Sequence, residues 1–305
     1  MAVTDATLAR ARIPFDRSIA LRHPAIFQRR VSPLLLRLAL LAIFVGLFVC
    51  AIYRLDLSVV RTLQGFGALV HFVSLMLPPS ASTWGKFLVY LHALGETIAI
   101  AFLGTLIAAV IAMPCGFLAS RNVMPIGVLR FFTRRVSDVV RGVDQLIWAL
   151  IWVGIVGLGP MAGVLAVATS DFGTFVKIFS EAIETADRRP VEGIMSSGGD
   201  KLEVIRFGIV PQVLPVLAGQ VLYLFESNTR SSTIIGIVGA GGIGLHLSEQ
   251  IRTLEWQHVS LLIIMILVAV ALTDAVASRL RRSIAGRAPV NWPPRDERGV
   301  DARRK

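Results

Sequence analysis

The chain has 305 residues, of which 54% are hydrophobic and only 17% are charged, and its formal net charge is +11. Several runs of about twenty apolar residues exclude a soluble globular domain and indicate a helical protein that crosses the membrane several times. The positive charge does not indicate a nucleic-acid-binding protein. The basic residues lie at the ends of the apolar runs, as is typical of the cytoplasmic ends of membrane helices.

The N-terminal region is predicted to be a cytoplasmic arm followed by a membrane helix. Residues 1–32 are polar and basic, and we expect them to be partly disordered. This polar segment is longer than the lead-in of a secretory signal, so a cleavable signal peptide is not predicted. Residues 33–86 are expected to hold the first membrane helix, roughly Leu34–Tyr53, and an external segment with a short interfacial helix.

The second membrane helix is predicted within Leu88–Met113, where closely spaced small residues suit tight packing between helices. Pro114 is expected to end it, and a basic loop with five arginines then extends to Arg141. The next uncharged run, Gln145–Ser170, has basic residues on both sides. A single span would place one basic group outside, so the positive-inside bias favours a hairpin of two helices that turns at Gly157–Pro160.

A polar stretch, Val191–Pro211, lies between apolar runs and is predicted to form two short helices. The Gly198–Gly199 pair is expected to stop the first helix, because glycine takes the left-handed conformation that helix ends need. Asp200 followed by Glu203 predicts a capping box at the start of the second helix. This second helix is expected to end at Pro211. An apolar ridge is expected on that second helix, formed by Leu202, Ile205 and Ile209.

One membrane helix, roughly Val213–Ile235, is predicted next, followed by a re-entrant or external glycine-rich segment. The last span is expected at about Val259–Val276. An extra span between them would place the basic residues that follow outside the membrane. The sequence therefore predicts an all-α protein with six membrane helices and both ends cytoplasmic. Residues 284–305 are expected to be a disordered cytoplasmic tail.

Glu226 and Arg230 lie four residues apart at membrane depth, so they share one helix face. Ionisable groups at that depth are costly, and they usually face an aqueous cavity or pair with each other. Two interpretations stay open: a structural ion pair within the helix, or a polar patch on a solute path that suits an anion. In the second, Asn228, Ser231 and Ser232 supply neutral hydrogen-bonding groups.

Glycines that follow this patch would permit close helix approach or a kink that acts as a gate. They are Gly236, Gly239, Gly241, Gly242 and Gly244. Their pattern formally matches a dinucleotide fingerprint, but a match after a membrane helix lacks the βαβ unit that this fingerprint requires. No GxxxxGK[ST] loop occurs and the five histidines are scattered. The sequence therefore predicts no catalytic residue, metal or cofactor in this chain.

Two segments resemble a known family. The spacing of Glu192, Gly198 and Pro211 is similar to the coupling loop of permease subunits of binding-protein-dependent ABC importers, although two other residues replace its alanine pair. The string from Phe225 to Gly244 resembles the fifth-span signature of phosphonate-importer permeases, a group whose relatives carry phosphate, phosphite and hypophosphite.

The resemblance implies a bacterial inner-membrane permease whose residues 87–283 form the five-helix core of type I ABC importers, a methionine-permease-like fold. Its coupling loop, residues 181–211, would dock on the ATPase through four residues: Glu192, Gly198, Asp200 and Pro211. The implied partners are two ATPase subunits that hold ATP and Mg²⁺, an extracytoplasmic solute-binding protein, a second copy of the chain and the lipid membrane, but no nucleic acid. Two rivals stay open: a methionine or osmolyte permease, and a structural or signalling membrane subunit without a path.

Overall fold

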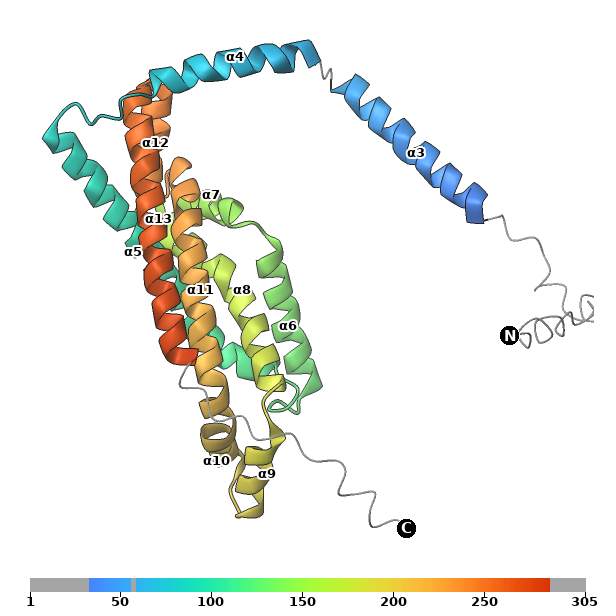
Figure 1. The fold of residues 1–305 in the computed structure, drawn as a ribbon. Coiled ribbons are helices and arrows are strands. Elements are labelled where there is room, and N and C mark those ends of the chain that lie inside the picture. The colour runs from blue at the N-terminus through green and yellow to red at the C-terminus, as the bar shows by residue number, and fades with distance from the viewer. Residues whose placement is uncertain (1–32, 56–58, 286–305) are drawn as a thin grey trace, which may run out of the picture. The chain divides into compact units, whose positions relative to one another are not determined.

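A computed structural model describes residues 33–55 and 59–285 of the chain, and Figure 1 shows its helices. The predicted arm, residues 1–32, and the predicted tail beyond residue 285 lie outside the described residues. Within the described residues every regular element is a helix, which confirms the predicted all-α class.

The chain divides into two compact units between His71 and Phe72. In the first unit α3 (Pro33–Arg54) is an apolar helix of 22 residues, about 33 Å long, which is enough to cross a bilayer. It confirms the first predicted span. α4 (Val59–Leu75) follows and runs across the boundary between the units. It provides the helix expected in the segment after the first span, and its interfacial position stays a prediction.

The second unit is a helical bundle built around α5 (Trp84–Ala119) and α8 (Pro160–Glu184), which pack on each other. Small residues allow the close approach, since a β-carbon added to Gly104 would lie only 2.5 Å from that of Val167. Nearer the C-terminal end of α8, small residues of α5 pack against two phenylalanine rings of α8. The buried residues of this cluster include Ala108, Ala109, Ala112, Phe175 and Phe179.

α5 does not end at Pro114, as the sequence analysis expected, but continues to Ala119. A proline inside a helix removes one backbone hydrogen bond and costs roughly 3 kcal/mol. The turn beyond it contributes Gly116 and Ala119, which are buried in contact with α8 and its neighbours, and this packing offsets the loss. The predicted basic loop therefore shortens to residues 120–126, and the rest of it is helical.

The predicted course of the third span is wrong, because in the structure this span is a bent pair of helices. α6 (Gly127–Gly142) packs antiparallel to α8 and meets α7 (Gln145–Val156) at an 89° bend (Figure 1). Asp144 causes the break, because its side chain accepts a hydrogen bond from the backbone two residues on and so caps a new helix. α7 has 12 residues, about 18 Å, which is too short to cross a bilayer alone. The turn at Gly157–Pro160, however, is confirmed.

α9 (Arg188–Ser196) and α10 (Lys201–Glu203) form the predicted pair of short helices, with Gly198 at φ +85° in the turn. The capping box is confirmed. Asp200 accepts a hydrogen bond from the N–H of Glu203, and the carboxylate of Glu203 accepts one from the N–H of Asp200.

The second of these helices does not end at Pro211. It continues through a π-helical turn, Val204–Ile209, into α11 (Val210–Ile237), so that one helix of 37 residues results. In this turn the N–H of Val210 bonds to a carbonyl five residues back. The regular ladder is therefore already displaced where Pro211 lacks its N–H, and the helix tolerates the proline.

The predicted apolar ridge of this second helix is split between two environments. Ile209 is buried in the core and Ile205 packs partly against it, whereas Leu202 is 73% exposed. Only Leu202 of the three is therefore fully open for a partner.

After α11 a glycine turn leads into α12 (Ile243–Arg252), which is too short to span, and then into α13 (Trp256–Ala285), which confirms the last predicted span. Among the described residues five helices are long and apolar enough to cross a membrane, and the bent pair α6–α7 brings the number to six. The two short helices α9 and α10 lie at the opposite end of the bundle from α12 (Figure 1).

Candidate functional site

Glu226 on α11 pairs with Arg281 on α13, so the predicted ion pair within one helix is not formed. α11 and α13 pack side by side, which brings the guanidinium group across the helix interface and within 6.0 Å of the ring centroid of Tyr223. Only 18% of the Glu226 side chain is exposed. The charge of Glu226 is therefore compensated by a different helix.

Arg230 is exposed, and among the described residues it makes no hydrogen bond or ion pair. It shares a face of α11 with Tyr223, Ile234 and Ile237, which are also exposed, whereas Asn228 on the opposite face is buried. An unpaired guanidinium group facing lipid is costly. This face of α11 therefore suits contact with water, an anion or another protein surface.

Asn228 lies in the interior of the bundle at the centre of a polar cluster. Its amide nitrogen donates to Thr105 Oγ1 over 2.7 Å and to Asp171 Oδ2, and its oxygen lies 3.5 Å from the amide nitrogen of Gln145. The cluster joins α5, α7, α8 and α11. A part for Asn228 in a solute path stays a prediction.

Asp171 is the residue that sequence reasoning missed. It is 6% exposed in a membrane helix, and it has no basic partner in the part of the chain that the structure describes. The available signal was an acidic residue directly after the uncharged run that ends at Ser170. Within the described residues no group of three or more His, Cys, Asp or Glu side chains is placed to hold a metal ion.

The two serines predicted for the path differ in their surroundings. Ser231 is half-buried and directly follows Arg230 on α11. Ser232 is buried, and its hydroxyl has no hydrogen-bond partner within the described residues.

The glycines predicted as a gate or packing site lie in the tight turn between α11 and α12 and in the adjoining ends of these two helices. Three of them have positive φ: Gly239 (+96°), Gly241 (+84°) and Gly242 (+73°). The N–H of Gly159 donates to the carbonyl oxygen of Gly239 over 2.9 Å, so this turn contacts the turn between α7 and α8. A β-carbon on Gly244 would lie 2.0 Å from the carbonyl oxygen of Thr233, and one on Gly236 would lie 2.9 Å from Cα of Gly244. The contacts are those of close packing, and gating stays a prediction.

The residues predicted to couple to an ATPase lie at the end of the bundle formed by α9 and α10 (Figure 1). Glu192, Gly198, Asp200 and Pro211 are all exposed. The exposed apolar side chains around them are Met195, Leu202 and Phe207. A groove of about 560 Å³ separates these helices from the loop before α6, and its lining includes Arg121, Val123, Val191, Glu192, Lys201 and Ile205.

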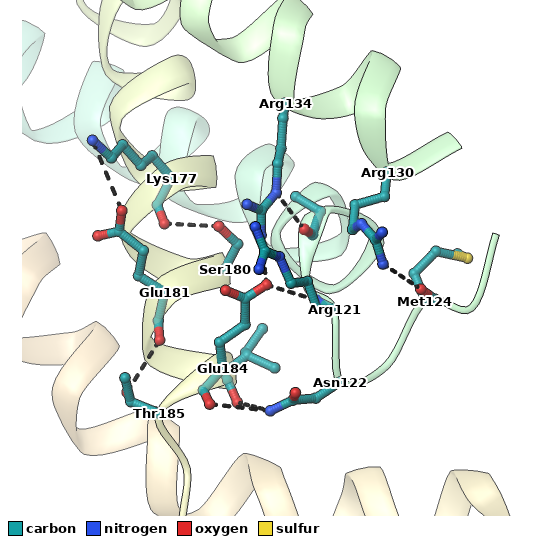
Figure 2. A network of polar contacts seen from close by, with 12 residues as sticks. Arg121, Asn122, Met124, Arg130, Arg134, Lys177, Ser180, Glu181, Glu184 and Thr185 are labelled. Atoms are coloured by element: carbon teal, nitrogen blue, oxygen red, sulfur yellow. Dashed lines mark hydrogen bonds and ion pairs between the residues drawn. The ribbon is translucent and has the colours of Figure 1, made fainter. Parts of the chain in front are cut away.

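Figure 2 shows a polar network at the point where α8 ends. Glu184 Oε1 accepts hydrogen bonds from Arg134 Nη2 over 2.5 Å and from the backbone N–H of Arg121 over 2.7 Å. Asn122 donates to the carbonyl oxygen of Glu184, and Arg134 Nε donates to that of Ala119 over 2.8 Å. The ends of α5 and α8 are thus joined to α6 directly before α9 begins.

This arrangement of helices and loops has known counterparts. Residues 112–286 match the family of binding-protein-dependent transport system inner membrane components, and this match covers more than half of the chain. The chain belongs to this family.

Known relatives indicate to which group within this family the permease belongs. A putative phosphite transport system permease of Stutzerimonas stutzeri is 36% identical over 260 residues, which are 85% of this chain and 89% of the relative. A phosphate-import permease of Mycolicibacterium smegmatis is 35% identical over 87% of this chain and 50% of the relative. A putative cryptic phosphonate transport system permease of Escherichia coli K12 is 47% identical over 39% of this chain and 97% of the relative. The permease is thus of the phosphonate type, as the resemblance predicted.

Solved structures share the fold of the permease. An inward-facing form of the MetNI methionine ABC transporter matches with a TM-score of 0.58 and 18% identity, over 66% of this chain and 99% of that one. An amino acid ABC transporter crystallised with histidines matches with a TM-score of 0.54 and 18% identity, over 72% and 98%. At these identities the likeness shows the fold alone, and it confirms the predicted core of type I importers.

Proposed function

We propose that the permease forms the membrane path of an ABC importer for a phosphorus oxyanion: phosphonate, phosphite, phosphate or hypophosphite. The observation that carries the proposal is Arg230, an exposed guanidinium group on α11 without a partner among the described residues. Arginine suits these solutes because its planar fork of donors matches the oxygens of a phosphate-like group. The solutes named for the relatives from S. stutzeri and M. smegmatis belong to the same chemical class.

The charge balance around Arg230 supports an anionic solute. Glu226 lies one helical turn away and would oppose anion binding if it were free, but Arg281 compensates its charge. Ser231, which is half-buried and directly follows Arg230, would add a neutral hydroxyl donor. The open face of α11 therefore presents one uncompensated positive charge and a neutral hydrogen-bond donor to a solute.

The remaining assembly is part of the same proposal. A second copy of the chain would cover the open face of α11, so that Arg230 lines a path between two permeases. Two ATPase subunits that bind ATP and Mg²⁺ would dock on α9 and α10, where Glu192, Met195 and Leu202 are exposed. A solute-binding protein would dock at the opposite, extracytoplasmic end, since the family depends on binding proteins. ATP hydrolysis would belong to the partner, and the permease itself would be no enzyme.

Uptake by whole cells tests this proposal. Cells without their own systems for phosphorus oxyanions would express the permease together with its ATPase and its binding protein. We expect uptake of labelled phosphonate, phosphite or phosphate that requires all three proteins and is not competed by methionine. Uptake of methionine or an osmolyte alone would favour the rival permease, and no uptake of any solute would favour a subunit without a path.

A further inference from the structure

We infer that Arg134 and Glu184 form the joint that makes α6 follow the coupling helices α9 and α10 during transport. This inference rests on the proposed function, because it assumes that a partner ATPase moves α9. Neither residue is among the four predicted to contact the ATPase, although Glu184 lies within the predicted coupling loop, residues 181–211. The pair connects three helices in one place (Figure 2).

The geometry of Arg134 suits a mechanical joint. Its guanidinium group uses two different nitrogens, Nη2 for the carboxylate of Glu184 and Nε for the carbonyl oxygen of Ala119. The carboxylate in turn accepts the backbone N–H of Arg121. Because the guanidinium group is planar and rigid, a displacement of the end of α8 relative to the end of α5 strains these bonds, and through the side chain of Arg134 it acts on α6. With 33% of Arg134 and 22% of Glu184 exposed, the pair is partly shielded from water and salt.

The position of Glu184 connects this joint to the coupling helices. Glu184 is the last residue of α8, and α9 begins four residues later at Arg188. At its other side this short connection is held to the start of α11, since the N–H of Asp187 donates to the side chain of Gln212 over 2.9 Å. A displacement of α9 therefore acts on the end of α8 within a few residues.

α6 leads from this joint to the polar residues of α11. It lies so close to α8 that a β-carbon on Gly173 would be 2.6 Å from the carbonyl oxygen of Ser137. Its other end bends into α7, whose first residue, Gln145, contacts Asn228, two positions before Arg230. A rigid helix of 16 residues, about 24 Å long, thus links the coupling end to the proposed path.

The neighbouring ion pairs provide a matched control. Lys177 and Glu181 are 3.8 Å apart and lie within α8, so this exposed pair joins no second element. Exposed ion pairs of this kind contribute little to the stability of the fold. Lys177→Gln therefore removes a basic residue of the same surface without touching the joint.

The test compares transport with ATP hydrolysis in the reconstituted complex of permease, ATPase and binding protein. In Arg134→Gln we expect ATP hydrolysis to persist while solute uptake per ATP falls by about tenfold, and in Lys177→Gln we expect the wild-type ratio. Arg134→Lys should be intermediate, because an ammonium group keeps the charge but not the fork. Arg134→Gln combined with Glu184→Gln should be no worse than either single change if the two residues act as one unit.

A second readout needs no solute and separates this inference from the proposed function. In a background with Cys50→Ser and Cys115→Ser, Val139→Cys on α6 is exposed and can report on its movement. We expect ATP to change its rate of thiol labelling by about tenfold in the otherwise wild-type complex but not with Arg134→Gln.

Two results would overturn the joint: an unaltered ratio of uptake to hydrolysis in Arg134→Gln, or loss of ATPase from the purified Arg134→Gln complex, which would make the pair a requirement for assembly. An ATP-dependent labelling change that Arg134→Gln abolishes, in a complex that imports no phosphorus oxyanion, would support the joint and contradict the proposed function.

Discussion

At the scale of single residues, the polar groups of α11 divide between two faces with different tasks. Asn228 and Ser232 face the interior, where Asn228 contacts Asp171 and ties three other helices to α11. Arg230 faces outward without a partner among the described residues, while Glu226 is compensated by Arg281. The exposed arginine is therefore the group with both charge and access to meet an anion.

Replacement of Arg230 tests this assignment. We expect Arg230→Gln to leave insertion and assembly intact, because the side chain makes no hydrogen bond or ion pair within the described residues. Transport should fall at least about tenfold, since a hydrogen bond to a charged group contributes roughly 1.5–3 kcal/mol. Uptake of the labelled oxyanion, normalised to purified complex, measures the effect.

The matched control removes a paired charge from the same helix. Glu226→Gln combined with Arg281→Gln neutralises both members of the ion pair at once, and we expect it to transport within about threefold of the wild type, because no unpaired charge is left behind. If Arg230→Gln transports as well as this double variant, Arg230 does not contact the solute.

The sequence identified the ionisable residues of α11 but not the residues that pair with them. The spacing of Glu226 and Arg230 correctly indicated that both lie on one helix, and their membrane depth stays a prediction. It could not show that Arg281, 55 residues away, supplies the partner, because one sequence carries no information on contacts between helices. Asp171 was missed for the same reason, since its burial depends on α5 and α11.

At the scale of elements, capping and glycine-turn signals located helix boundaries correctly, whereas prolines did not. The capping box at Asp200 and the turn at Gly198 depend on neighbouring residues alone, and both are present. The prolines Pro114 and Pro211 were expected to end helices, yet both lie within long ones. At Pro114 packing against α8 offsets the lost hydrogen bond, and at Pro211 a π-helical turn absorbs it.

The turn at Gly198 yields a prediction for the coupling end. A β-carbon there would meet nothing within 4 Å, so space does not restrict the position, but φ is +85°. A left-handed conformation costs a residue with a β-carbon about 1–2 kcal/mol, and a β-branched side chain fits it worst. We expect Gly198→Val to distort the turn and to reduce ATPase binding and transport, as measured by copurification and uptake, without loss of membrane insertion.

The same substitution at Gly193 is the control. Gly193 lies within α9, where a β-carbon also meets nothing within 4 Å and φ is not positive. Gly193→Val should therefore keep ATPase binding close to the wild-type level. Equal binding in Gly198→Val and Gly193→Val would show that the turn conformation does not matter for docking.

At the scale of the whole molecule, charge and hydropathy predicted the number of membrane spans. The packing of these helices on one another depends on contacts between residues far apart in the sequence. The turns at Gly159 and Gly239 were each expected as separate features, and in the structure a hydrogen bond joins them. The bent pair α6–α7 was not expected, because its basic residues suggested a loop. Its charges are accommodated in part by partners on other elements, such as Glu184 for Arg134.

Orientation in the membrane follows from the same distribution of charge. The basic residues around α6 and α9 favour the cytoplasm for both regions. We expect a cysteine at Ser196, which is exposed at the end of α9, to react with a membrane-impermeant reagent only after cells are opened. Labelling of Ser196→Cys in intact cells would place the coupling end outside and contradict the predicted topology.

ATP-driven accumulation in proteoliposomes tests the central claim, that this permease is the path for a phosphorus oxyanion, most directly. The complex of permease and ATPase would be reconstituted with ATP inside and with the binding protein and a labelled oxyanion outside. We predict accumulation of phosphonate, phosphite or phosphate that requires ATP and the binding protein and is lost with Arg230→Gln. Accumulation of methionine or an osmolyte with none of these anions, or no accumulation of any solute by a complex that hydrolyses ATP, would contradict the claim.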